Sequence, residues 1–261
     1  MYVDIGVASY PDLPLSELIQ RSRDIKVDFI EVVLEGEYHR ETLVNRVTEI
    51  DQLLDDKLDL IIHLPFGGID TGSPFDHVRS GAVQELKANI QLASKLGAKK
   101  AVFHAETYVH PAVWEKQTVV SSLIDSIREL VDFASEYNIE LGIENVPNPF
   151  IDITDFPKLF EESSVNATLD TGHSRVNQIS HITLTKLLET HSDRFTHFHL
   201  NDTRSTSDDH LPVGMGTTDF VSLFQSLPDD WAGSMTVEAI TTDFEYMAKG
   251  VENLRDQLAM L

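Results

Sequence analysis

Residues 100–145 read KAVFHAETYVHPAVWEKQTVVSSLIDSIRELVDFASEYNIELGIEN, and this stretch contains the unit that repeats along the whole chain. Two short apolar runs, Lys100–His104 and Glu140–Glu144, are typical of buried strands. Between them, apolar residues recur at the three- and four-residue spacing of one helix face, at Leu123, Ile127, Leu130 and Phe133. A strand, a helix and a second strand in this order predict a parallel β–α–β unit.

The same alternation continues on both sides of this stretch. Strand-like runs lie at Val3–Ala8, Phe29–Leu34, Leu58–Leu64, Lys100–His104, Glu140–Glu144, Asn166–Asp170, Phe195–Leu200 and Ser234–Glu238. Helix-like segments separate them; one stops at Gly97, and the last runs from about Phe244 to Met260. Eight strands alternating with helices in 261 residues predict one (β/α)8 TIM-barrel domain over residues 1–261. A doubly wound sheet is the alternative, but Ala8-Ser9-Tyr10-Pro11 is not a Gly-rich phosphate-binding turn.

Composition limits the classes of function. The formal charge is −23, from 43 acidic and 20 basic residues, which predicts a well-solvated surface or an adaptation to high salt and disfavours non-specific binding to nucleic acid. There are no cysteines, so disulfides and thiolate metal sites are excluded. The N-terminal residues do not resemble a signal peptide, and no run of about 18 apolar residues is present. We therefore expect a cytoplasmic protein without a membrane span.

Metal-binding residue types recur where the predicted strands end. His63, His104, Glu144, Asp170 and Glu238 each close a strand, and the seventh strand reads His197-Phe198-His199 before the loop residues Asp208-Asp209-His210. In a barrel these ends point to one rim, where active sites lie. Any one of these residues by itself is more typical of a structural hydrogen bond, an ion pair or a turn. Many acids at one rim would repel one another without cations, so the joint pattern predicts a metal site.

The types of ligand limit the metal. Mixed imidazole and carboxylate donors suit zinc, manganese, iron or cobalt. Nine candidate ligands exceed what one ion can use, so we expect two or three divalent ions, zinc first and manganese as the alternative. The nine are His63, His104, Glu144, Asp170, His173, His199, Asp208, His210 and Glu238.

Four segments carry a family resemblance: Ile143-Glu144-Asn145, Asp170-Thr171-Gly172-His173, His199-Leu200-Asn201-Asp202, and Asp208-Asp209-His210 leading into Gly214-Met215-Gly216. In this order they resemble the xylose isomerase-like barrels, which include endonuclease IV, sugar isomerases and sugar 3-epimerases. The resemblance spans nearly the whole chain. It implies the fold predicted above and a metal-dependent enzyme.

The resemblance also implies a ligand set. The isomerases and epimerases hold one metal ion with four residues that match Glu144, Asp170, His199 and Glu238. Endonuclease IV adds five more: His63 and His104 would hold another ion bridged by Glu144, and His173, Asp208 and His210 a third. Asp209 and His197 are neighbours of matched residues, and we expect them to support the ligands or the fold.

The loops differ from those of endonuclease IV. Leu64-Pro65-Phe66-Gly67-Gly68 does not resemble its aromatic DNA-penetrating loop, and no loop carries a dense cluster of Arg and Lys. The stretch from His63 to Phe66, Arg79 and the helix end at Gly97 resemble instead the sugar phosphate isomerase/epimerase branch. We therefore expect a small phosphorylated or sugar substrate rather than duplex DNA.

Three functions follow as hypotheses. The first is hydrolysis of a phosphate ester or phosphodiester, abasic DNA included, because His63, His104, Asp208 and His210 have no evident task in a one-metal isomerase. The second is isomerisation or epimerisation of a sugar or sugar phosphate, with Glu144 and Glu238 as the acid–base pair and His173 and Arg204 binding the substrate. The third is a non-catalytic sugar- or metal-binding barrel.

Overall fold

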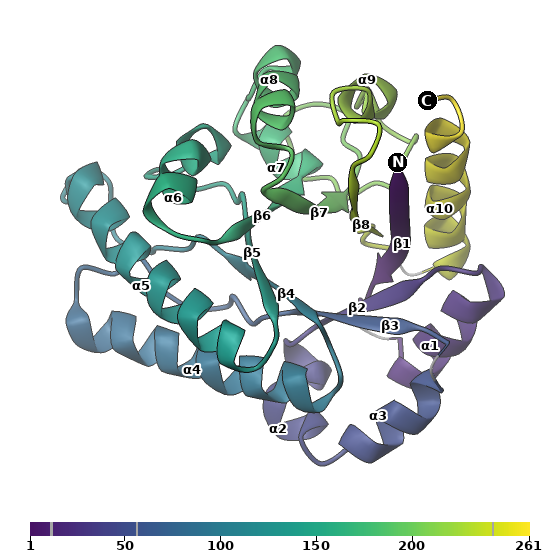
Figure 1. The fold of residues 1–261 in the computed structure, drawn as a ribbon, viewed down its shortest axis with the longest axis horizontal. Helices are drawn as coiled ribbons and strands as arrows, with labels where there is room; N and C mark the ends of the chain where they lie inside the picture. The colour runs from purple at the N-terminus through teal and green to yellow at the C-terminus, as the bar shows by residue number, and fades with distance from the viewer. Residues whose placement is uncertain (11–12, 56, 242) are drawn as a thin grey trace. The chain divides into compact units, whose positions relative to one another are not determined.

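The computed structural model describes residues 1–10, 13–55, 57–241 and 243–261. Its strands are β1 (Tyr2–Ala8), β2 (Phe29–Val33), β3 (Asp59–His63), β4 (Lys100–His104), β5 (Glu140–Glu144), β6 (Asn166–Asp170), β7 (Phe195–Leu200) and β8 (Ala232–Val237). They follow one another in chain order in a closed barrel (Figure 1). The predicted (β/α)8 fold is confirmed, and each predicted strand matches an observed one to within two residues at either end.

Helices connect the strands. They are α1 (Leu15–Asp24), α2 (Arg40–Leu43), α3 (Val47–Leu54), α4 (Asp76–Lys95), α5 (Lys116–Glu136), α6 (Phe156–Glu162), α7 (Thr171–Val176), α8 (His181–His191), α9 (Phe220–Phe224) and α10 (Phe244–Leu258), with short 3-10 turns at Gly36–Tyr38 and Ile153–Asp155. Helix α4 ends two residues before Gly97, whose φ of +85° is a conformation that glycine adopts at little cost. No helix among the described residues is long and apolar enough to cross a membrane.

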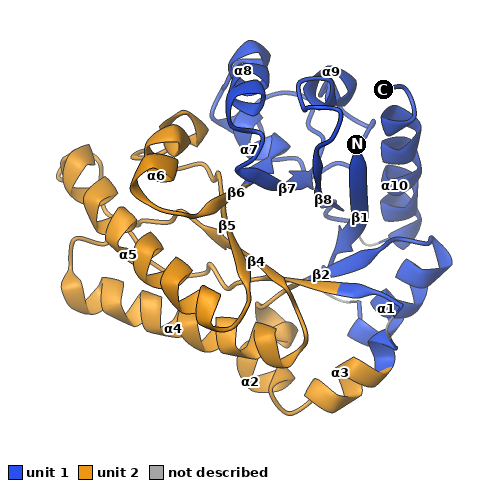
Figure 2. Ribbon diagram, in the orientation of Figure 1, with its two compact units in different colours: residues 1–31, 53–59, 168–261 blue, residues 32–52, 60–167 orange. Residues whose placement is uncertain are grey.

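The described chain divides into two compact units (Figure 2). Unit 1 comprises residues 1–31, 53–59 and 168–261, and unit 2 comprises residues 32–52 and 60–167. Within unit 2, β4 pairs in parallel with β3 and with β5, and α4 packs on α5. This register places His104 beside Glu144 on adjacent strands.

Within unit 1, β1 pairs in parallel with both β2 and β8, and β8 pairs with β7. Gly6 on β1 is opposite Phe29 on β2, and a Cβ at residue 6 would lie 2.3 Å from the Phe29 ring. The missing side chain therefore makes room for this ring, which also contacts the His197 ring at a centroid distance of 6.1 Å. The interior beside β7 is thus filled by close packing.

Candidate metal centre

Glu144 is the centre of a buried cluster in unit 2. It ends β5 and is 1% exposed. Its Oε2 lies 3.2 Å from Nε2 of His63 and 3.3 Å from Nε2 of His104, the last residues of β3 and β4. Three residues that the sequence analysis assigned to one metal are thus in contact.

The orientation of the His63 ring determines which of its nitrogens carries a proton. Its Nδ1 lies 2.9 Å from the carbonyl oxygen of Leu64, which can only accept, so Nδ1 carries a proton. The neutral ring then presents a lone pair at Nε2 toward a carboxylate oxygen. Two acceptors at 3.2 Å need either a proton or a metal ion between them.

Phe66 borders this cluster. The ring of Phe66 stacks on His104 with a centroid distance of 4.6 Å and an interplanar angle of 21°. The loop that carries Phe66 is held by Glu35, whose Oε1 accepts hydrogen bonds from the backbone N–H groups of Phe66 and Gly67. The Leu64–Gly68 loop therefore forms an apolar wall beside the two histidines.

Glu106 was missed in the sequence analysis. Its Oε1 lies 3.5 Å from Nδ1 of His104. Its position two residues beyond the end of β4 was the available signal, because it shares the strand-end pattern of the predicted ligands.

In unit 1, Asp170, His199 and Glu238 form a second cluster. Asp170 ends β6, His199 lies near the end of β7, and Glu238 directly follows β8. One donor atom from each lies within 4.8 Å of the others, and His199 Nδ1 is 3.6 Å from Glu238 Oε2. Asp170 and His199 are fully buried, whereas the Glu238 side chain is 20% exposed, so Glu238 can meet both a metal ion and a substrate.

The Asp170-Thr171-Gly172-His173 segment fits closely around this cluster. Asp170 accepts the backbone N–H of His173 at 2.6 Å and the Asn201 side-chain amide at 2.7 Å. A Cβ on Gly172 would lie 1.8 Å from Oδ1 of Asn201. The glycine in this motif therefore lets Asn201 reach the carboxylate and fix its orientation.

His173, Asp208 and His210 form a third cluster in unit 1. Asp208 Oδ2 lies 3.5 Å from His173 Nε2 and 3.2 Å from His210 Nε2. Burial lowers the pKa of His210, but the hydrogen bond that its ring donates to Asp208 and the charges of Glu238, Asp170 and Asp208 outweigh this effect and raise the pKa to about 9. Burial likewise raises the pKa of Asp208, but its two histidine neighbours hold that pKa well below the usual range.

Asp208 and Asp209 have different surroundings. Among the described residues, Asp209 forms no hydrogen bond or ion pair with either histidine of the third cluster. It accepts hydrogen bonds from Thr203 Oγ1, the Arg204 backbone N–H and Ser207 Oγ, which fold its own loop. Arg204, predicted to bind substrate, has an exposed side chain on that loop. Its role and the ligand role of Asp208 stay predictions.

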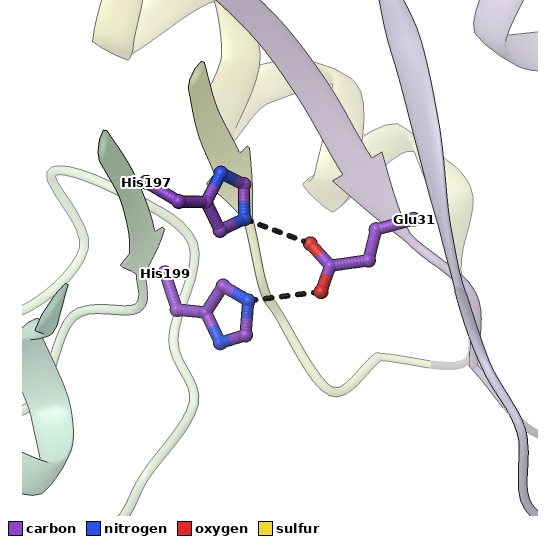
Figure 3. Close-up of side chains that lie close together, drawn as sticks. All are labelled: Glu31, His197 and His199. Carbon is purple, nitrogen blue, oxygen red and sulfur yellow. Dashed lines mark hydrogen bonds and ion pairs between the residues drawn. The ribbon is translucent and has the colours of Figure 1, made fainter. Parts of the chain in front are cut away.

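A fourth cluster was missed in part. Figure 3 shows the carboxylate of Glu31 facing the rings of His197 and His199. Its Oε2 lies 3.1 Å from His197 Nε2, and its Oε1 lies 3.0 Å from His199 Nε2. Burial would raise the pKa of Glu31, but the two imidazoles hold that pKa well below its usual range. The available signal was an acid in the middle of the apolar run Phe29–Val33.

The donor spacing tests whether these residues fit a divalent ion. Ligand atoms about 2.0–2.1 Å from a tetrahedral zinc ion lie roughly 3.3 Å from one another. The nitrogen-to-oxygen distances around Glu144 and Asp208 are 3.2–3.5 Å, with His199 Nδ1 to Glu238 Oε2 at 3.6 Å. The donors are imidazoles and carboxylates, as nitrogen- and oxygen-seeking metals require. The residues present fit a divalent ion.

Comparison with known families decides the classification. The family described as xylose isomerase-like TIM barrel matches residues 19–261. The chain belongs to this family. Two similar proteins of Methanocaldococcus jannaschii, the uncharacterised MJ1311 and MJ1614, are each 25% identical to it. MJ1311 matches over 89% of this chain and 82% of its own length, and MJ1614 over 89% of both.

Solved structures share the fold. A D-tagatose 3-epimerase-like protein superposes with a TM-score of 0.81 at 22% identity, covering 98% of this chain and 97% of its own. D-allulose 3-epimerase from Methylomonas sp. gives 0.79 at 18% identity, covering 98% of both chains. The 3-keto-D-glucoside 4-epimerase YcjR of E. coli gives 0.74 at 19% identity, covering 99% and 98%. At these identities the likeness establishes the barrel fold.

Proposed function

We propose that this chain is a divalent-metal-dependent isomerase or epimerase of a sugar or sugar phosphate. One observation carries the proposal: the donor atoms of Asp170, His199 and Glu238 lie within 4.8 Å of one another at the ends of their strands, and Glu238 remains accessible. Family membership supports it, as does the similarity of the fold to solved sugar epimerases. This reverses the order of the first two sequence hypotheses.

The proposed ligands are Glu144, Asp170, His199 and Glu238. A divalent ion, when bound there, would bind adjacent sugar oxygens and acidify the carbon-bound hydrogen beside the carbonyl group. Zinc and manganese both suit the donor set.

The chain's own carboxylates would move the proton. Glu238 is the stronger candidate for contact with substrate, because its side chain is 20% exposed and two imidazoles, His199 and His210, face its Oε2 at 3.6 and 3.9 Å. Glu144 is buried and would be the partner acid or base. A carboxylate base placed against the substrate contributes about 10²–10⁴-fold to the rate.

Binding of the substrate would involve His173 and Arg204. His173 is 9% exposed at its side chain and contacts Asp170 and Asp208, and Arg204 is exposed on the loop after β7. A guanidinium group on an exposed side chain suits a phosphate or a row of hydroxyls. A small phosphorylated or sugar substrate fits these groups, and the net charge of −23 opposes a polyanion such as DNA.

Isotope exchange tests the proposal directly. Purified protein loaded with zinc or manganese is incubated with a panel of ketoses, aldoses and their phosphates in D2O, and NMR follows solvent deuterium at the carbon beside the carbonyl. We expect exchange with at least one sugar and its loss in Glu238→Gln. Asp230→Asn, at an exposed position, is the control and retains full exchange. Absence of exchange across the panel would refute the proposal.

A second candidate is hydrolysis of a phosphate ester or phosphodiester. The observation that favours it is the pair of additional clusters, His63–Glu144–His104 and His173–Asp208–His210, which a one-metal isomerase does not require. Clustered ions polarise a phosphoryl oxygen and activate water. Here Glu144 would bridge two ions, and the donor set suits zinc.

Metal counting separates the two candidates. Elemental analysis of protein purified without chelator gives one tightly held ion per chain under the first proposal and two or three under the second. Turnover of bis-p-nitrophenyl phosphate and of abasic DNA is measured in parallel. Two or three ions together with phosphodiester cleavage and no deuterium exchange would replace the first proposal by the second.

A further inference from the structure

We infer that Glu31 is a positioning residue that fixes the ring orientation and the tautomer of His199, so that Nδ1 of His199 presents its lone pair toward Glu238. The inference rests on the proposed metal site, in which His199 is a ligand. Glu31 lies on β2 and His199 on β7, and 168 residues separate them in sequence.

The contacts of Glu31 divide its two oxygens between two rings. Oε1 is 3.0 Å from Nε2 of His199, and Oε2 is 3.1 Å from Nε2 of His197 (Figure 3). Oε2 also accepts the hydroxyl of Thr236 at 2.5 Å. A carboxylate can only accept, so each ring donates its Nε2–H to it. A neutral His199 that donates through Nε2 has its lone pair at Nδ1.

His197 links Glu31 to Ser234. Its Nδ1 is 2.6 Å from the hydroxyl of Ser234, which can donate to it. His197 and Ser234 are opposite one another on β7 and β8, and His199 is opposite Thr236. All five side chains are at most 5% exposed, so His197, His199 and Thr236 hold Glu31 in a buried network.

The geometry favours hydrogen bonds over a further metal ion among Glu31, His197 and His199. Each nitrogen faces its own oxygen at 3.0–3.1 Å, whereas around Glu144 two nitrogens converge on one oxygen. A metal-ligating histidine commonly donates its other ring N–H to a carboxylate, which fixes its tautomer and raises its basicity. Glu31 stands in that relation to His199, whose Nδ1 is 3.6 Å from Glu238.

The first test reads the tautomer without metal or substrate. Long-range ¹H–¹⁵N correlation spectra are recorded on chelator-treated protein at pH 8.5, with His199→Gln used to assign the ring. In the wild type we expect the His199 ring to be protonated at Nε2 alone. In Glu31→Gln we expect a mixture of tautomers, because an amide offers one acceptor oxygen to the two rings instead of two. Thr236→Val, which leaves both oxygens of Glu31 in place, is expected to keep the wild-type pattern.

The second test measures affinity. Zinc and manganese dissociation constants are determined by chelator competition for the wild type, Glu31→Gln and the exposed control Glu136→Gln. We expect Glu31→Gln to weaken binding by about 10–100-fold and the control to leave it unchanged. Thermal unfolding of the metal-free variants checks that each is folded.

The outcomes separate this inference from the proposed function. Protonation of His199 at Nδ1 or at both nitrogens overturns the inference, as does an unchanged metal affinity in folded Glu31→Gln. If Glu31→Gln does not fold, the wild-type and Thr236→Val spectra decide whether His199 is protonated at Nε2 alone. A wild type that shows the expected tautomer but binds no metal refutes the proposed function and leaves the hydrogen-bond assignment standing.

Discussion

Glu144 and Glu31 are both buried carboxylates flanked by two histidines, and the two arrangements differ. In unit 2, His63 and His104 both point Nε2 at the same oxygen of Glu144, at 3.2 and 3.3 Å. In unit 1, His197 and His199 each have their own oxygen of Glu31, at 3.1 and 3.0 Å. One glutamate and two histidines therefore form two different kinds of contact.

The difference lies in where the ring protons go. His63 donates its Nδ1 proton to the Leu64 carbonyl oxygen. Its Nε2 is therefore an acceptor, and it faces a carboxylate oxygen of Glu144, which is also an acceptor. The histidines at Glu31 donate through Nε2, Thr236 donates to Oε2 of Glu31, and Ser234 can donate to Nδ1 of His197. The first arrangement suits a cation, and the second is satisfied by hydrogen bonds alone.

The largest effect is expected at the Glu144 cluster. Glu144→Gln removes a charge proposed to hold the metal and move a proton, so turnover on the sugar identified by isotope exchange should fall about 10²–10⁴-fold. The measurement is kcat at saturating metal. Asp230→Asn serves as the charge-matched control. Retained turnover in Glu144→Gln would show that Glu144 resembles Glu31 in being a structural acceptor.

The double variant His63→Ala/His104→Ala tests whether the Glu144 cluster holds its own ion. If the protein is a one-metal isomerase, elemental analysis should find one ion per chain in the wild type and in the double variant. A loss of one ion per chain, together with loss of phosphodiester cleavage, would instead support the second candidate function. Circular dichroism confirms folding.

Thr236→Val tests whether the Glu31 cluster is stabilised by hydrogen bonds. The change removes a buried donor to Glu31 at nearly constant volume, and a carboxylate left short of a partner costs about 1–3 kcal/mol. The free energy of unfolding is measured in urea. Thr190→Val, at an exposed position on α8, is the control and should change it by no more than about 0.5 kcal/mol. Equal values for the two variants would contradict the network.

The smallest effect is a pH dependence of the metal-free protein. The pKa of His210 is raised from 6.5 to about 9, so its contribution to stability is complete below pH 6.5 and is lost as the pH rises through about 9. Asp208→Asn should therefore destabilise the chelator-treated protein more at pH 5.5 than at pH 9.5. The difference should stay below about 1 kcal/mol, because Asp208 is 38% exposed. A larger loss at pH 9.5 would contradict this coupling.

Several features of the site followed from local sequence. His63, His104, Glu144 and Asp170 end their strands as predicted, since short apolar runs fix where a strand stops and which residue closes it. The family resemblance named Asp208 rather than Asp209 as the acid that accompanies His210. In the structure Asp208 contacts His173 and His210, while Asp209 binds its own loop.

The sequence by itself determined the barrel, because strand and helix periodicities are local and alternate eight times in chain order. It also determined the types of donor available for a metal. Only the tertiary structure decided the partners of those donors. Glu31 and His197 are 166 residues apart, and their contact depends on the pairing of β1 with both β2 and β8. No local pattern encodes that pairing, since the closed sheet alone brings these strands together.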